Sequence, residues 1–171
     1  DVSHLALKLL ILTGLRTAPV ISAHIDEIDG DVWTVPAVKV KGKLGETSDF
    51  RVPLSYEALR VIKDAKENSK HGYLFPGSRK PTISLDSMAA IMRKRGFEAR
   101  PHGFRTSLKT WMSDTQQVSR EVSEMVISHQ TGSRIERAYN RTDYLEQRRD
   151  LGSRWLNLRP PEGGLFQSDR N

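Results

Sequence analysis

The chain has 171 residues, of which 37% are hydrophobic and 28% are charged, a composition typical of ordinary globular domains. Its length suits one domain with a single buried core. No apolar run approaches the roughly 20 residues that cross a bilayer, which argues against a membrane-spanning class. Because the sequence contains no cysteine, it excludes disulfides, a thiol nucleophile and a thiolate zinc site, and it fits a reducing compartment.

Positive charge is concentrated in one segment. The chain carries 27 Lys or Arg against 21 Asp or Glu, and residues 79–110 hold eight of the basic residues but only two of the acidic ones. The net charge of that segment is therefore +6, the same as the net charge of the whole chain. A field of one sign favours a polyanionic partner such as nucleic acid. The alternative is a solvated basic helix face without a partner.

Hydrophobic periodicity predicts two helices at the start of the chain. The first is capped by Asp1 or Ser3 and ends at Gly14. The second is expected over 17–23, with Pro19 tolerated in its first turn because a first-turn N–H has no partner within the helix.

Short strands and then helices follow a turn at 26–30. Short β-branched and apolar runs predict antiparallel strands at 32–35, 38–41 and 50–52, joined by a polar hairpin loop at 42–48. Helices are expected at 55–66, 84–96, 103–113, 118–127, 133–139 and 143–156. We therefore predict an α+β fold that is mainly α-helical, with a small antiparallel β-sheet packed on a helical body. The domain covers 1–157, and 158–171 form a flexible C-terminal tail.

Arg16 and Arg105 are the first candidate functional side chains. Arg16 follows a turn after an apolar helix, where its paired donors suit a phosphate, although an arginine beyond a helix end more often caps carbonyl groups or meets solvent. Arg105 and His102 stand three residues apart at a helix start, where anions are favoured. A surface pair beside a core Phe104 is the alternative.

His129 and Tyr139 are further candidates, ten residues apart near predicted helix ends. Either side chain could be structural, because a lone histidine usually satisfies a local hydrogen bond and a tyrosine often packs its ring in a core. None of these short motifs specifies a reaction by itself.

Taken in order, the local sequences form a pattern. They are Leu-Thr-Gly-Leu-Arg at 12–16, Trp-Thr-Val-Pro at 33–36, Val-Lys-Gly at 40–42, Arg-Val-Pro-Leu-Ser at 51–55, His-Gly-Phe-Arg at 102–105, Ile-Ser-His at 127–129 and Ala-Tyr-Asn-Arg at 138–141. Between residues 5 and 156 this order resembles the catalytic domain of the tyrosine recombinases, in particular prophage and genomic-island integrases. Charge and periodicity alone indicate only a basic, mostly helical DNA-binding protein.

The resemblance implies a site-specific DNA recombinase that integrates or excises phage or mobile-element DNA through a 3′-phosphotyrosyl intermediate. It assigns catalytic roles to Arg16, Lys41, His102, Arg105, His129 and Tyr139. Tyr139 is the implied nucleophile, and the two arginines bind the non-bridging oxygens. Lys41 protonates the leaving 5′-oxygen, although a hairpin lysine in solvent is the alternative. His102 accepts the tyrosine proton or orients the phosphate, and His129 hydrogen-bonds to the phosphate.

Partners and location follow from the same resemblance. It implies double-stranded attachment sites as substrate, a homotetramer in the synaptic complex, accessory DNA-bending proteins, and the cytoplasm of a bacterium, at the nucleoid. No metal or cofactor is expected, because the covalent link conserves the energy of the broken bond. Contacts to flanking DNA are expected from Lys39, Lys43, Arg93, Lys94, Arg95 and Lys109.

One position departs from the family pattern. The family commonly has an acid three residues after the first arginine, where this chain has Pro19. The absence of this acid suggests one alternative function, a DNA-binding remnant with weakened or lost catalysis. A strand relaxer resembling type IB topoisomerases is another. Because the sequence begins without Met, directly at the first helix, we expect a fragment of a longer protein that binds duplex DNA weakly.

Overall fold

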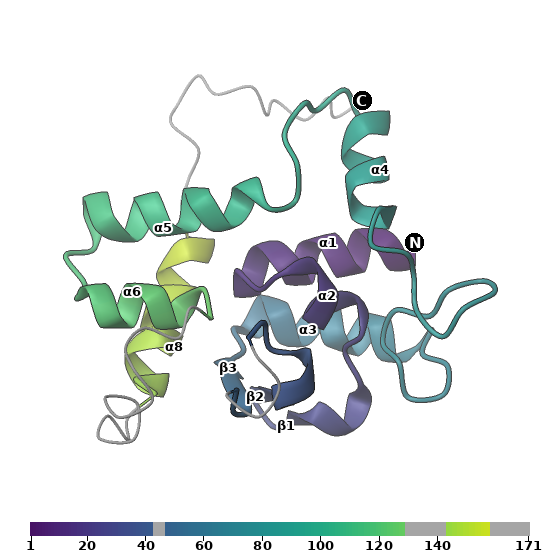
Figure 1. Cartoon of the computed structure of the whole chain (residues 1–171), viewed down its shortest axis with the longest axis horizontal. Helices are drawn as coiled ribbons and strands as arrows, with labels where there is room; N and C mark the ends of the chain where they lie inside the picture. Colours follow the sequence, from purple (N-terminus) through teal and green to yellow (C-terminus); the bar gives the residue numbers. More distant parts are fainter. Residues whose placement is uncertain (43–46, 129–142, 158–171) are drawn as a thin grey trace.

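The computed structural model describes residues 1–42, 47–128 and 143–157, which form a helical body with a small sheet at one edge (Figure 1). The α-helices are α1 (Val2–Thr13), α2 (Thr17–Ile21), α3 (Tyr56–Lys66), α4 (Ser87–Lys94), α5 (Gly103–Thr115), α6 (Arg120–Val126) and α8 (Leu145–Leu156). The strands are β1 (Ile28–Asp29), β2 (Val32–Val35) and β3 (Phe50–Pro53), and short 3-10 helices are η1 (Ile25–Glu27) and η2 (Ala37–Lys39). The predicted fold class is confirmed. The predicted helix at 133–139 and the tail at 158–171 lie outside the described residues.

Helix ends follow the chemistry that the sequence predicts. The Asp1 carboxylate accepts a hydrogen bond from the Ser3 backbone N–H at 2.8 Å, and Ser55 caps α3 in the same manner through Ala58. Gly14 ends α1 in the left-handed conformation at φ 63°, which costs glycine little. The second helix is shorter than expected and stops at Ile21.

The sheet is antiparallel, in the order β1-β2-β3. Trp33 pairs with Val52, and all four alternate side chains on the inner face of β2 and β3 are buried. The expected strand at 38–41 is wrong. After Pro36 the chain instead turns through η2, where the Asp49 carboxylate accepts a hydrogen bond from the Ala37 N–H at 2.9 Å, so this N–H bonds a side chain rather than a strand partner. The expected turn at 26–30 contains the two residues of β1, which the sequence did not indicate.

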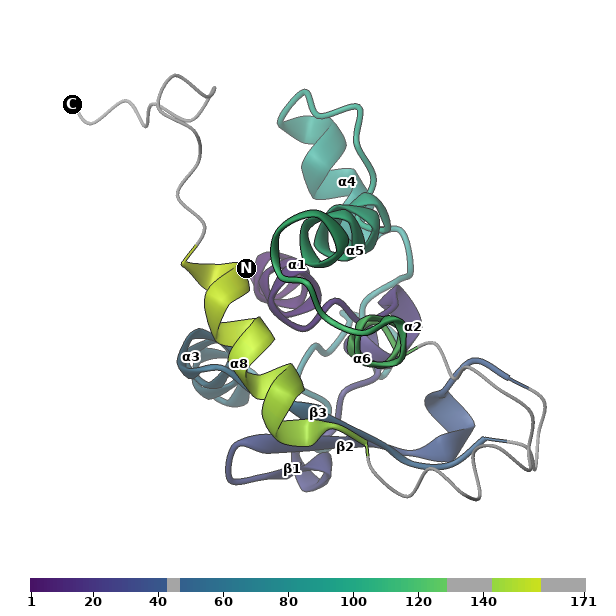
Figure 2. The same cartoon turned by 90° about the vertical axis from the view of Figure 1, so that its left-hand side faces the viewer.

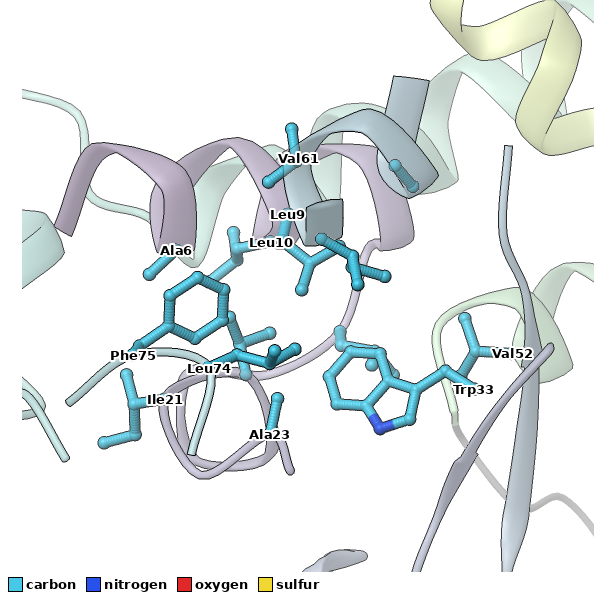
Figure 3. Close-up of a cluster of buried hydrophobic side chains, with 14 of the residues drawn as sticks. Ala6, Leu9, Leu10, Ile21, Ala23, Trp33, Val52, Val61, Leu74 and Phe75 are labelled. Atoms are coloured by element: carbon cyan, nitrogen blue, oxygen red, sulfur yellow. The ribbon is translucent and has the colours of Figure 1, made fainter. Parts of the chain in front are cut away.

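A large core surrounds α1 and joins it to α2, α3 and the sheet (Figure 3). Ala6, Leu9 and Leu10 of α1 are fully buried, and they face Phe75 and Trp33 from distant parts of the sequence. This burial explains why the helix forms, since a broad apolar stripe on one side must be covered.

A second, smaller core lies between α5, α6 and α8 (Figures 1 and 2). It contains Leu108, Met112 and Leu151, and the rings of Trp111 and Trp155 lie 5.4 Å apart. The Trp155 Nε1–H donates to the Ile11 carbonyl oxygen at 3.1 Å. That bond ties α8 to α1 and so joins the two cores.

A buried arginine ties α8 to the sheet. Arg148 is 3% exposed and donates to the carbonyl oxygens of Arg51, at 2.7 Å, and Asp143, at 3.1 Å, while its guanidinium lies 4.5 Å from the centre of the Phe50 ring. Arg51 in turn makes two parallel hydrogen bonds to the Asp143 carboxylate at 2.8 and 2.9 Å. Burial lowers the pKa of Arg148 to about 10, which still leaves it charged at neutral pH. The polar cluster therefore fixes the first turn of α8 against β3.

Replacing Gly14 with alanine tests the contact between the two cores. The new Cβ would lie 2.6 Å from Leu108 Cδ2, so Gly14→Ala should lose about 1–2 kcal/mol for the left-handed backbone and about 1–3 kcal/mol more for overpacking. Gly96→Ala is the matched control, because Gly96 has φ 77° and open space around its Cβ position. Urea denaturation measures both, and equal losses would show that the Leu108 contact is unimportant.

Candidate active site

Arg105 is buried between the two cores. It lies in the first turn of α5 and is 4% exposed. Its Nη1 donates to the Gly14 carbonyl oxygen and its Nη2 to the Ile127 carbonyl oxygen, the latter at 2.6 Å. One side chain therefore joins the end of α1 to the end of α6, two segments that are 113 positions apart in the sequence.

Arg16 approaches the same end of α6. It is the N-cap residue of α2, and its Nη1 donates to the Ser128 carbonyl oxygen at 3.3 Å and to Ser128 Oγ at 3.2 Å. Ser128 is buried and has φ 50°, a conformation that serine rarely adopts. The two arginines thus hold the adjacent residues Ile127 and Ser128.

Both guanidinium groups bind neutral acceptors. Across the described parts of the chain, neither Arg16 nor Arg105 forms an ion pair with a carboxylate. Burial, followed by the charge of Arg16, lowers the pKa of Arg105 to about 10, and burial also lowers the pKa of Arg16. Two neighbouring cations without a counter-charge are costly, and an anion bound between them would offset that cost. Paired N–H donors suit a phosphate in particular.

Of the other predicted catalytic residues, the structure describes His102 and Lys41. His102 is exposed at the N-cap position of α5, three residues before Arg105, and makes no capping hydrogen bond. Lys41 is exposed on the β2–β3 connection just after η2. Among the described residues it makes no hydrogen bond to Arg16 or Arg105. His129 and Tyr139 lie outside the described residues, as does Lys43 of the predicted DNA contacts.

The predicted DNA contacts also differ. Lys94 is exposed on α4, and Arg95 at its end approaches His4 Nε2 at 3.5 Å. Arg93 forms an exposed pair with Asp86, and the half-exposed Lys109 pairs with the buried Glu124, at 2.6 Å each. The exposed Arg93–Asp86 pair contributes little stability and can exchange for a phosphate.

Lys39, another predicted DNA contact, is paired within the domain. Its ammonium is paired with the Glu27 carboxylate and also donates to the Ser22 carbonyl oxygen at 2.5 Å. Both bonds are internal to the domain and the side chain is 21% exposed, so a DNA contact by Lys39 would require these bonds to break.

Sequence reasoning missed Ser128 and Glu27 as partners of the basic residues. Ser128 lay within the quoted Ile-Ser-His motif, but nothing in a short motif shows that a serine will accept from an arginine more than a hundred residues away. For Glu27, the sequence showed only that it lies in an acidic turn, which does not identify Lys39 as its partner. In the described ranges, no group of three or more His, Asp or Glu side chains is arranged to hold a metal ion, and no helix is long and apolar enough to cross a membrane.

The helical body and the three-stranded sheet give this domain the fold of the tyrosine recombinase catalytic domains. The sequence profile described as "Phage integrase family" matches residues 2–146. The chain belongs to the phage integrase family.

Two curated relatives illustrate the similarity. The chain is 32% identical over 155 residues to the prophage integrase IntA of Escherichia coli K12, a match that covers 86% of this chain and 36% of IntA. It is 28% identical over 174 residues to the integrase of Enterobacteria phage P4, which covers 91% of this chain and 39% of that protein. The chain therefore spans less than half the length of these relatives.

Solved structures share the fold. The integrase from mycobacterium phage Brujita has a TM-score of 0.65 at 19% identity, over 91% of this chain and 51% of that one. A lambda integrase, solved as a tetramer bound to a Holliday junction, has a TM-score of 0.54 at 18% identity, over 99% of this chain and 45% of that one.

The arginine pair predicts saturable binding of inorganic phosphate. At a phosphate concentration ten times its Kd, the free energy of unfolding should rise by about 1.4 kcal/mol, and Arg16→Met should abolish the increase. Arg60→Met is the control, because Arg60 is exposed on α3 and paired with the exposed Glu57. Thermal denaturation in phosphate, against chloride of equal ionic strength, measures the effect. An equal phosphate response in wild type and Arg16→Met would contradict the assignment.

Proposed function

We propose that this chain is the catalytic domain of a site-specific DNA recombinase that integrates or excises phage or mobile-element DNA. The observation that carries the proposal is that the guanidinium groups of the buried Arg105 and the half-buried Arg16 lie close together and, within the described residues, bind neutral acceptors. We assign the catalytic domain to 1–157. Membership of the phage integrase family and the shared fold support this function.

The proposed reaction exchanges one phosphodiester for another. The Tyr139 oxygen attacks the scissile phosphorus, the bond from phosphorus to the 5′-oxygen breaks, and a 3′-phosphotyrosyl link forms. Arg16 and Arg105 bind the non-bridging oxygens, where negative charge accumulates. Lys41 donates a proton to the departing 5′-oxygen, and His102 accepts the tyrosine proton. A 5′-hydroxyl from the same or another strand then reverses the steps.

His129 is assigned a hydrogen bond to the same phosphate. A free tyrosine has a pKa near 10, so its attack at neutral pH needs both a proton acceptor and nearby cations. Because the covalent link keeps the energy of the original bond, the reaction requires neither ATP nor a metal for rejoining.

Double-stranded attachment sites are the proposed substrate. One structure of the same fold is a Tn1549 transposon integrase in complex with circular intermediate DNA, and another is the lambda integrase tetramer on a Holliday junction. By analogy we propose a homotetramer of the intact protein on two duplexes, with accessory DNA-bending proteins. Chromosomal DNA as a target would place it in the bacterial cytoplasm, at the nucleoid.

Pro19 favours one competing function, a DNA-binding remnant. It occupies the position of the family acid, and in the described residues no carboxylate replaces that acid beside Arg16. A strand relaxer of the topoisomerase IB type is distinguished by its products, since it rejoins the original strand without exchanging partners.

A covalent trap separates an enzyme from a remnant. Duplex DNA carrying an attachment site, with a nick that lets the cleaved end diffuse away, should accumulate an adduct that denaturing electrophoresis resolves. Tyr139→Phe should abolish the adduct, because the phosphotyrosyl bond cannot form. Tyr56→Phe is the matched control, since Tyr56 is exposed on α3. An adduct that survives Tyr139→Phe would overturn the nucleophile, and no adduct from the wild-type protein would favour the remnant.

Duplex binding should depend steeply on salt. Four phosphate contacts would lower the affinity about 150-fold between 50 and 200 mM salt, through counterion release. The proposed contacts are Arg16, Lys94, Arg95 and Arg105. Lys94→Met should reduce the logarithmic slope by about 0.9, and Arg60→Met should leave it unchanged. Fluorescence anisotropy measures the slope, and salt-independent binding would refute phosphate contact.

A further inference from the structure

Glu27 holds three parts of the chain together. It ends η1, and its carboxylate is only 10% exposed. It accepts hydrogen bonds from Trp33 Nε1 on β2 at 3.0 Å and from the backbone N–H of His24 at 3.3 Å, and it pairs with the ammonium of Lys39 on η2. Charge-assisted bonds in a water-poor setting are stronger than exposed ones. The Glu27–Lys39 pair therefore fixes η2 against η1 and the sheet.

Lys39 also connects η2 to the helix that begins at the catalytic arginine. Its ammonium donates to the carbonyl oxygen of Ser22 at 2.5 Å. Ser22 is the C-cap of α2, and Arg16 is the N-cap of the same five-residue helix. The five-residue helix α2 and the Lys39–Ser22 hydrogen bond thus connect Arg16 to Lys39.

Lys41 lies two residues beyond Lys39. Val40, between them, is buried in the large core. From the other side of the connection, Thr47 Oγ1 donates to the Ala37 carbonyl oxygen at 3.1 Å. The backbone before Lys41 is therefore held on both sides, while the Lys41 side chain itself is exposed.

We infer that Glu27 and Lys39 form a positioning pair, which places the Lys41 ammonium to protonate the leaving 5′-oxygen. The inference rests on the proposed function and assigns to two residues a task that none of the recognised motifs covers. A lysine has a long flexible side chain, so its reach is defined only when its backbone is fixed. Misplacement of a reacting group by about 1 Å can cost about 100-fold in rate.

The leaving group provides a specific readout. A 5′-alkoxide needs a proton as the bond to phosphorus breaks, whereas a thiol has a pKa near 8.5 and its thiolate leaves without one. Sulfur in place of the bridging 5′-oxygen should therefore bypass Lys41 and whatever positions it. It should not bypass Arg16, which acts on the non-bridging oxygens.

The experiment compares single-turnover adduct formation on nicked attachment-site DNA with bridging 5′-oxygen or 5′-sulfur. Glu27→Gln and Lys39→Met should slow cleavage of the oxygen substrate about 10- to 100-fold, as Lys41→Met does more severely, and should cleave the sulfur substrate nearly as fast as wild type. Lys39→Arg should retain most activity because it keeps the pair. Asp31→Asn is the matched control, since it breaks an exposed ion pair with Arg149 beside the same sheet and should affect neither substrate.

Cleavage of the sulfur substrate also shows that each variant is folded. Equal losses on both substrates, or no loss on the oxygen substrate, would overturn the positioning role. Equal losses that match those of Arg16→Met would indicate a role in phosphate binding instead. If the wild-type protein formed no adduct with either substrate, the proposed function itself would fail, and the positioning role with it.

Discussion

The structure depends on one buried guanidinium that lies where two hydrophobic cores meet. Arg105 lies in the first turn of α5, the helix that contributes Leu108 and Met112 to the smaller core. It donates to the carbonyl oxygens of Gly14, at the end of α1, and Ile127, at the end of α6. Without it, two buried carbonyl groups would lose a strong donor, at about 1–3 kcal/mol each. The same guanidinium that we propose binds the phosphate therefore also sets the spacing of the helices.

This arrangement has an electrostatic cost, and among the described residues no carboxylate pairs with either arginine to offset it. Arg16 lies close enough to lower the pKa of Arg105, and the acceptor that holds Arg16 is the uncharged Ser128. Within the described residues the pair thus keeps its positive charge. Pro19 contributes to this, because an acid at that position would neutralise part of the charge.

Local rules predicted most of the helices and two strands, but little of what holds the site. Gly14 and Ser55 mark helix ends through interactions within a few residues, so the sequence alone locates them. The strand expected at 38–41 failed because side-chain bonds from the hairpin favour a turn over a ladder. Arg148 and Lys39 look like surface residues in a sequence, and only the packing of distant elements buries the first and pairs the second.

The partners of Arg105 are main-chain atoms, and this has a consequence for divergence. Every residue presents a carbonyl group, so substitutions at the positions that accept from the guanidinium leave the acceptors in place, provided that the backbone keeps its path. Selection then acts on the arginine and on the course of the chain rather than on matched pairs of side chains. A catalytic framework of this kind can be inherited while the surrounding sequence drifts, as a shared fold at 18–19% identity illustrates.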